Sequence, residues 1–156
     1  MTYAISLQTV APRSLASVRA SMPIRDVPTR FRESLDQVYA AARGGHVLLD
    51  GQNIFVYRAG PDGVADIEFG VGTRAPFAPV GRVTFTALPS GVAATTTHWG
   101  DYSGLGAAHE AVAGWCAANQ HQLAGVVWEV YGHWDDDPAR RRTDVFHLLV
   151  AAPATA

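Results

Sequence analysis

The feature that most constrains the fold is an internal repeat, because both halves of the chain run through the same order of predicted elements. Residues 8–22 and 85–99 each have the pattern of a strand, a proline-centred turn and a second strand, with Pro12 and Pro89 at the turns. Few residues are identical between the two segments, so the repeat is recognised by the order of elements. It predicts a fold built from two copies of one α/β unit.

An amphipathic helix follows this strand pair in each copy, over residues 27–43 and roughly 103–119. In both helices apolar residues recur at spacings of three and four, which places them on one face. Gly44-Gly45 is a stop signal for the first helix, and Asp101 or Ser103 can cap the second. The predicted apolar faces consist of Val27, Phe31, Leu35, Val38 and Ala42 in the first helix, and Leu105, Ala108, Val112, Trp115 and Cys116 in the second.

A β-hairpin closes each copy, with strands at 53–57 and 66–71 in the first and at 126–131 and 143–150 in the second. Glycine, proline and aspartate mark the turns, whereas β-branched and aromatic residues mark the strands. The order strand–strand–helix–strand–strand therefore occurs twice. We predict an α+β fold with two antiparallel sheets and two main helices around a central ligand cleft.

The whole chain, residues 1–156, is expected to form a single domain of two pseudo-symmetric repeats, at about 1–76 and 80–152. Neither repeat is long enough to bury its sheet well alone. Two similar lobes leave a groove between them, and such grooves commonly hold ligands.

Composition and charge narrow the class of protein. Hydrophobic residues make up 48% of the chain and charged residues 17%, which favours a packed core. The net charge is −2, and the basic run 140–142 follows the acidic run 135–137, so we expect a solvated hairpin loop and no direct nucleic-acid binding. No apolar run approaches the ~18 residues of a membrane span. With Cys116 as the only cysteine and no signal peptide pattern, a cytoplasmic protein is predicted.

Glu129 is the residue that does not fit a plain core. Alternation places Val127, Glu129 and Tyr131 on one face of a strand whose other face, with Trp128, is also apolar. A carboxylate there loses solvation unless something pairs with it. It is either a structural acid with a partner in the protein or a ligand-facing acid, and the aromatic residues predicted nearby favour the second interpretation. Aromatic faces around an acid suit a lipophilic cation.

Other kinds of site have weaker support. The six histidines lack the spacing of a zinc site, so we expect no metal, and no nucleotide-binding or nucleophile motif predicts a cofactor. His98 comes directly before Trp99-Gly100 at the start of the second helix, where it could have a structural role, titrate near neutral pH or orient a water.

Three segments together resemble the GyrI-like small-molecule-binding domains, which are also the effector-binding domains of multidrug-sensing regulators of the MerR and AraC types. They are 98–105 (His-Trp-Gly-Asp-Tyr-Ser-Gly-Leu), 128–131 (Trp-Glu-Val-Tyr) and 143–146 (Thr-Asp-Val-Phe). The resemblance covers nearly the whole chain and is to a stand-alone member. It implies an aromatic cleft between two repeats with an acid at its base, whose position matches Glu129. The ligand-binding residues are therefore predicted to be Glu129, Tyr131, Trp99, Tyr102, Phe146, Phe55 and Tyr57.

The resemblance leaves the activity open. The first hypothesis is a protein that binds hydrophobic, drug-like or cationic compounds for sensing, sequestration or resistance. The second is a hydrolase, because some stand-alone members open strained rings of cyclopropane-bearing genotoxins. In that case Glu129 would activate water, and Tyr102 or His98 would orient it or donate a proton. A third, weaker hypothesis is a protein-interaction module that inhibits another enzyme through the acidic run 135–137. As partners we expect a small molecule and neither membrane nor nucleic acid, with the chain a monomer or homodimer.

Overall fold

The structure, a computed structural model, describes residues 2–151 and divides into two compact units. The first unit is residues 12–88, and the described part of the second is residues 2–11 together with 89–151. The first unit contains β2 (Ser14–Pro23), α1 (Val27–Arg43), β3 (Leu49–Ala59), β4 (Val64–Thr73) and β5 (Thr84–Ala87). The second contains β1 (Ser6–Val10), β6 (Gly91–Trp99), the 3-10 turn η3 (Tyr102–Gly104), α2 (Leu105–Ala118), β7 (Leu123–Tyr131), the 3-10 turn η4 (Pro138–Arg140) and β8 (Arg142–Leu149).

The two units have the same strand order. The second unit is an antiparallel sheet in the order β1-β6-β8-β7, and the first is an antiparallel sheet in the order β5-β2-β4-β3. In each unit the edge strand is supplied by the other half of the sequence, because β1 pairs with β6 and β5 pairs with β2. The predicted α+β class, with antiparallel strands and two main helices, is confirmed. The prediction of one domain with repeats at 1–76 and 80–152 stays a prediction, and residue 152 lies outside the described residues.

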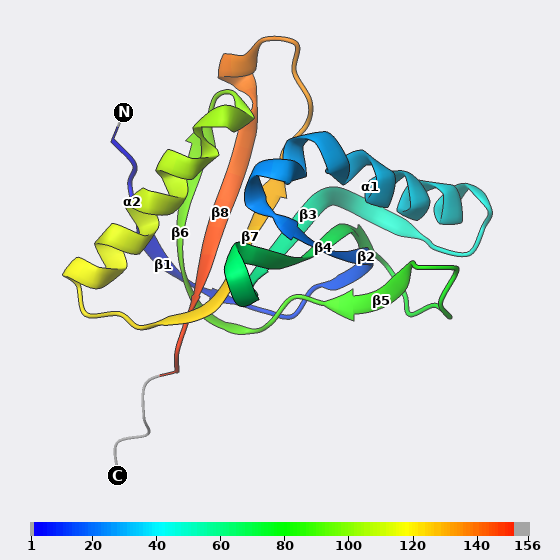
Figure 1. The fold of residues 1–156 in the computed structure, drawn as a ribbon, viewed down its shortest axis with the longest axis horizontal. Helices are drawn as coiled ribbons and strands as arrows, with labels where there is room; N and C mark the ends of the chain where they lie inside the picture. The colour runs from blue at the N-terminus through cyan, green and yellow to red at the C-terminus, as the bar shows by residue number, and fades with distance from the viewer. Residues whose placement is uncertain (1, 152–156) are drawn as a thin grey trace. The chain divides into compact units, whose positions relative to one another are not determined.

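In the second unit, α2 lies against β6 and β8 (Figure 1). The buried core on this side of the sheet includes Ala108, Val112 and Cys116 from the helix and Val145 from β8, all 0% exposed. These helix residues belong to the predicted apolar face, so its 3.6-residue period sets the contact with the sheet. The predicted start at 103 is the turn η3, where the carboxylate of Asp101 accepts a hydrogen bond from the backbone N–H of Tyr102.

In the first unit, α1 packs on β2 and β4 and spans the predicted range 27–43. Leu35 and Val38 are buried on its inner face. Phe55 of β3 lies between two aromatic neighbours, with its ring centroid 5.8 Å from that of Phe31 and 4.9 Å from that of Phe69. Phe55 is therefore a core residue under α1, with 5% exposure.

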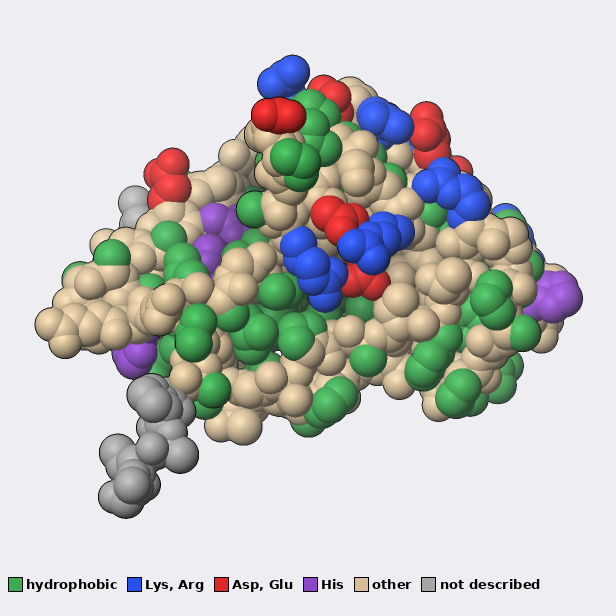
Figure 2. Space-filling model, turned by 60° about the horizontal axis from the view of Figure 1, so that its bottom comes forward, with side chains coloured by type: hydrophobic (Ala, Val, Ile, Leu, Met, Phe, Trp, Pro, Cys, Tyr) green, Lys and Arg blue, Asp and Glu red, His purple; other side chains and the backbone are tan. Residues whose placement is uncertain are grey.

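Charged side chains of opposite sign lie beside one another on the face shown in Figure 2. Ion pairs within the units include Arg19–Asp66, Arg58–Glu68 and Arg142–Asp144.

Among residues 2–151, no helix is long and apolar enough to cross a membrane.

Candidate functional site

Glu129 lies on the α2 side of the second unit's sheet. Its register neighbour on β8 is Val145, a residue of the core under α2. Glu129 is only 4% exposed, and each carboxylate oxygen has a partner. The Tyr131 hydroxyl donates to Oε1 at 3.0 Å, and Nε2 of His109 on α2 lies 3.4 Å from Oε2. The acid that the sequence singled out is therefore buried and held between a phenol and an imidazole.

His109 continues this contact to a second histidine. Its Nδ1 lies 2.9 Å from Nε2 of His147 on β8, and the two ring centroids are 5.1 Å apart. His147 is 6% exposed, and its Nδ1 has no hydrogen-bond partner within the described residues. Burial, and secondarily the charge of His109, lowers the pKa of His147 to about 4. His147 is thus a neutral imidazole at physiological pH, at the end of a partly buried Glu129–His109–His147 chain in which the His109 side chain is 24% exposed.

The Glu129–His109–His147 contacts do not have the geometry of a metal site. In residues 2–151, no three or more His, Cys, Asp or Glu side chains are grouped so that they could hold a metal ion. His109 instead lies between its two partners and uses one ring nitrogen for each of them. The arrangement suits the movement of a proton between side chains.

Three aromatic residues, which we call the aromatic ladder, connect Glu129 to the surface. The rings of Tyr131 and Tyr102 meet edge to face at 5.5 Å, and the ring of Tyr102 lies 6.3 Å from that of Trp134. Trp134 is 64% exposed, so the ladder runs from solvent to a buried carboxylate. Burial raises the pKa of the Tyr102 hydroxyl, against the opposing effect of Arg141, so Tyr102 stays a hydrogen-bond donor.

The aromatic ladder already holds a cation of the protein itself. The guanidinium of Arg141 lies 3.7 Å above the ring of Trp134 and 5.8 Å from that of Tyr102. Its Nε donates to the backbone carbonyl of Asp135 at 2.8 Å. Arg141 therefore departs from the expectation of a fully solvated loop, because its side chain is only 12% exposed. The contact shows that these ring faces are arranged to accept a positive charge.

His98 is buried on β6, with both ring nitrogens already in use. Nε2 lies 2.8 Å from the carbonyl oxygen of Asp101, and Nδ1 lies 2.8 Å from the hydroxyl of Tyr3. Because a carbonyl only accepts, Nε2 carries a proton, and Nδ1 is the nitrogen that contacts Tyr3. A Cβ added at Gly104 would lie 2.7 Å from the ring, and Gly100 has a φ of +140°. The glycines after His98 thus make room for a ring that fixes the start of α2.

Two of the predicted ligand residues, Trp99 and Phe146, lie on the opposite face of the same sheet from Glu129. Phe146 pairs in register with Trp128, and their rings stack at 5.3 Å with an interplanar angle of 7°. Trp99 is half exposed, and the guanidinium of Arg142 lies 5.7 Å from the centre of the Trp99 ring. The sheet therefore separates these two aromatics from Tyr102, Tyr131 and Glu129.

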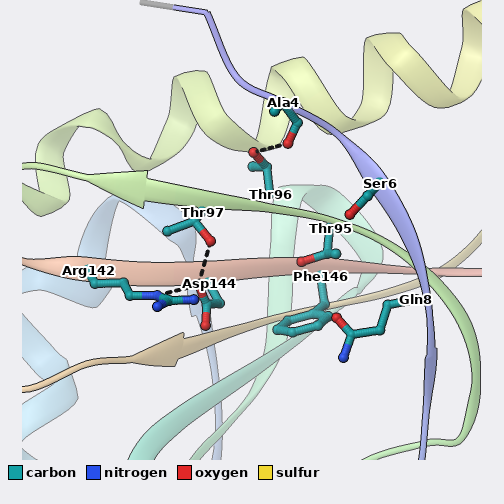
Figure 3. Close-up of a pocket in the computed structure, with 9 residues that line it drawn as sticks. All are labelled: Ala4, Ser6, Gln8, Thr95, Thr96, Thr97, Arg142, Asp144 and Phe146. Carbon is teal, nitrogen blue, oxygen red and sulfur yellow. Dashed lines mark hydrogen bonds and ion pairs between the residues drawn. The ribbon is translucent and has the colours of Figure 1, made fainter.

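A shallow pocket of about 330 Å³ occupies this second face (Figure 3). Its centre is polar, because Oδ1 of Asp144 accepts from the Thr97 hydroxyl at 2.8 Å and from Nε of Arg142 at 3.0 Å. Phe146 supplies the aromatic part of its wall. The lining residues are Ala4, Ser6, Gln8, Thr95, Thr96, Thr97, Arg142, Asp144 and Phe146.

The remaining predicted ligand residues, Phe55 and Tyr57, are on β3 of the first unit. Phe55 is buried under α1, and Tyr57 is half-buried. The cleft expected between the two repeats stays a prediction.

Sequence reasoning missed four residues that contact Glu129, His109 or the aromatic ladder, although two had a signal. His109 is four residues after Leu105 and three before Val112, so the helical period places it on the buried side of α2. His147 alternates with Val145 and Leu149 on β8 and therefore faces the same core. Trp134 and Arg141 belong to the loop between β7 and β8, and no periodic pattern predicts their contact.

Comparisons with known proteins give the fold. No protein-family model matches the chain, and the search of curated proteins gives no match. Among solved structures, the EcmrR C-terminal domain is 20% identical, with a TM-score of 0.78 over 97% of this chain and 100% of that one. In an EcmrR–DNA complex the match spans 57% of the EcmrR chain.

Two further structures extend the comparison. SAV2435 bound to tetraphenylphosphonium is 14% identical, with a TM-score of 0.69 over 96% of this chain and 94% of that one. A hydrolase from Listeria innocua is 10% identical, with a TM-score of 0.64 over 94% and 91%. The chain therefore has the α+β fold shared by the EcmrR C-terminal domain and SAV2435, which is the fold that its resemblance to the GyrI-like small-molecule-binding domains implied.

Proposed function

We propose that this protein binds hydrophobic, cationic small molecules beside Glu129, for sensing, sequestration or resistance. The single observation that carries the proposal is a buried carboxylate at the inner end of an aromatic ladder. Glu129 is 4% exposed, and Tyr131, Tyr102 and Trp134 lead from it to solvent. Ring faces attract a cation through their quadrupole, and a poorly solvated carboxylate supplies the opposite charge.

The contacts around Glu129 indicate which side chains a bound ligand would have to displace. The carboxylate contacts the Tyr131 hydroxyl and the His109 imidazole. A cation that reaches Glu129 must take the place of at least one of them. A tyrosine hydroxyl does not cancel the charge of the acid, and neither does an imidazole without a second proton. A ligand with a full positive charge therefore adds an electrostatic attraction to Glu129 that such donors lack.

A pair of similar ligands with different charge tests this proposal. Tetraphenylphosphonium is the cationic probe, chosen because SAV2435 was solved with it bound, and triphenylphosphine oxide is a neutral aryl phosphorus compound. We expect tetraphenylphosphonium to quench tryptophan fluorescence with saturation and to bind at least about tenfold more tightly than the neutral compound. Trp134→Phe should remove much of the signal. Equal affinity for the two compounds, or no saturable binding of either, would refute the proposal.

A second candidate function is hydrolysis of strained electrophiles such as cyclopropane-bearing genotoxins. It is favoured by the contact between Glu129 and His109, since a carboxylate paired with an imidazole can take a proton from water. The water oxygen would bond to a ring carbon, the strained carbon–carbon bond would break, and its electron pair would move to the conjugated carbonyl oxygen. Tyr102, which keeps its proton, could protonate that oxygen. His98 has both nitrogens engaged, so its contribution would be to position the turn that carries Tyr102.

Mass spectrometry distinguishes this activity from binding. A cyclopropane-bearing electrophile incubated with the protein should gain the mass of one water, about 18 Da, faster than in buffer. Glu129→Gln should abolish the gain, whereas Glu110→Gln, at an exposed position on α2, should retain it. Formation of product at the same rate with Glu129→Gln would rule out the hydrolase role for this acid.

A further inference from the structure

We propose that His109 is a charge-specificity residue of the Glu129 site, and that a proton on its ring and a cationic ligand exclude each other. The inference rests on the proposed function and adds to it a coupling between ligand binding and proton release. It is built from the Glu129–His109–His147 chain, whose three members come from β7, α2 and β8.

The donor and acceptor roles of Glu129, His109 and His147 leave room for one additional proton on these three side chains. A carboxylate has no proton to donate, so His109 with a single ring proton pairs best with Glu129 when that proton is on Nε2, and Nδ1 then accepts from Nε2–H of His147. In this state the proton of His147 points toward His109, and the Tyr131 hydroxyl points toward Glu129. When His109 gains a proton, its Nδ1 becomes a donor and His147 must change to the other tautomer.

His147 allows this change because its second nitrogen is uncommitted. Nδ1 of His147 is buried without a hydrogen-bond partner within the described residues. When His147 changes tautomer, its Nε2–H bond breaks and an Nδ1–H bond forms, and Nε2 then accepts from Nδ1–H of His109. No hydrogen bond at Nδ1 of His147 has to be given up for this change. His147 itself stays neutral, because burial and the nearby charge of His109 lower its pKa to about 4. The extra charge is therefore confined to His109.

Among the described side chains that face His109, Glu129 is the one that carries a negative charge. From β7 it meets Glu129, with Tyr131 on the same carboxylate, and from β8 it meets His147. On β6 the titratable residue on this face is His98, which is committed to Asp101 and Tyr3. The neighbouring Glu110 of α2 is exposed.

One buried carboxylate compensates one positive charge, and a second cation beside it would be left unpaired at high cost. A cationic ligand must therefore bind the form in which His109 is neutral, or expel its proton. Affinity for a cation should therefore rise with pH, by up to about tenfold for each pH unit over the range in which His109 loses its proton. A neutral ligand should show no such dependence.

Isothermal titration calorimetry of tetraphenylphosphonium, in buffers of different ionisation enthalpy, measures the protons released. At the acidic end of a pH series we expect release that approaches one proton per ligand for the wild-type protein and close to none for His109→Gln. The matched control is His121→Gln, because His121 stacks on Trp115 just beyond α2 and has no described contact with Glu129. It should release protons as the wild type does. Binding without proton release in the wild-type protein, or the same release with His109→Gln, would overturn the inference and leave the proposed function standing.

A ligand-free measurement keeps the inference testable if tetraphenylphosphonium does not bind. Nitrogen-15 NMR of the histidine rings should show a coupling through the hydrogen bond between Nδ1 of His109 and Nε2 of His147. In the wild-type protein a fall in pH should change His147 from the Nε2–H to the Nδ1–H tautomer as His109 is protonated, and Glu129→Gln should move that change to lower pH. If His147 keeps one tautomer throughout, or if Glu129→Gln has no effect, the coupling does not exist.

Discussion

Replacing His147 by glutamine should make the protein less sensitive to acid. His147 has its pKa lowered from 6.5 to about 4 because the ring is buried and near His109. The unfolded chain therefore takes up this proton at a higher pH than the folded protein does. The contribution of the neutral His147 ring to the unfolding free energy is fully present above pH 6.5 and is lost as the pH falls from 6.5 toward 4.

The magnitude follows from the size of the shift. At about 1.4 kcal/mol for each pH unit, a pKa lowered from 6.5 to about 4 corresponds to roughly 3 kcal/mol of unfolding free energy lost between pH 7 and pH 4. Glutamine cannot be protonated, yet it keeps an N–H that can reach His109. His147→Gln should lack this loss, even if its stability at pH 7 is lower than that of the wild type.

Urea denaturation followed by tryptophan fluorescence at pH 7, 6, 5 and 4 gives the required free energies. Other groups, such as Asp66 with its pKa lowered mainly by its hydrogen bond to Arg19, titrate in both proteins and cancel in the comparison. His121→Gln is the control for removal of a histidine and should follow the wild type. If wild type and His147→Gln lose equal stability between pH 7 and pH 4, the buried, neutral state assigned to His147 is wrong.

Three further predictions concern stability. The Thr143 hydroxyl is buried with no hydrogen-bond partner within the described residues, so Thr143→Val should leave the unfolding free energy unchanged or raise it by up to about 1 kcal/mol in urea denaturation. Gly104→Ala places a methyl group against the fixed ring of His98 and should lower the unfolding free energy by about 1–3 kcal/mol, and an unchanged melting temperature would contradict this. Arg141→Met keeps the side-chain length but removes the cation above Trp134, and it should cost about 1 kcal/mol and change the emission of Trp134.

The elements were predictable because their patterns are local. Helix α1 occupies the predicted range, and the apolar period of α2 identified its buried side. The exchange of edge strands was not predictable, because β1 and β2 are adjacent in sequence and nothing local states that β1 pairs with β6. Such long-range pairing depends on which strand edges are free in the folded protein.

The candidate site was predictable in part for the same reason. Alternation along one strand placed Glu129 and Tyr131 on one face, and their hydrogen bond fits that expectation. Trp99 and Phe146 belong to other strands, so their face depends on a register that the sequence alone does not supply. His109 was overlooked because a single histidine on a helix is usually a surface or packing residue, and its role depends on a partner 20 positions away.

The role proposed for Glu129 is that of counter-ion for a cationic ligand. Isothermal titration calorimetry of tetraphenylphosphonium at pH 7.5 should show affinity reduced by about 10- to 100-fold for Glu129→Gln, as expected for loss of a poorly solvated charge pair. Glu110→Gln removes the same charge from an exposed position on the same unit and should bind as the wild type does. Equal affinity of Glu129→Gln and wild type, with both folded, would contradict the account.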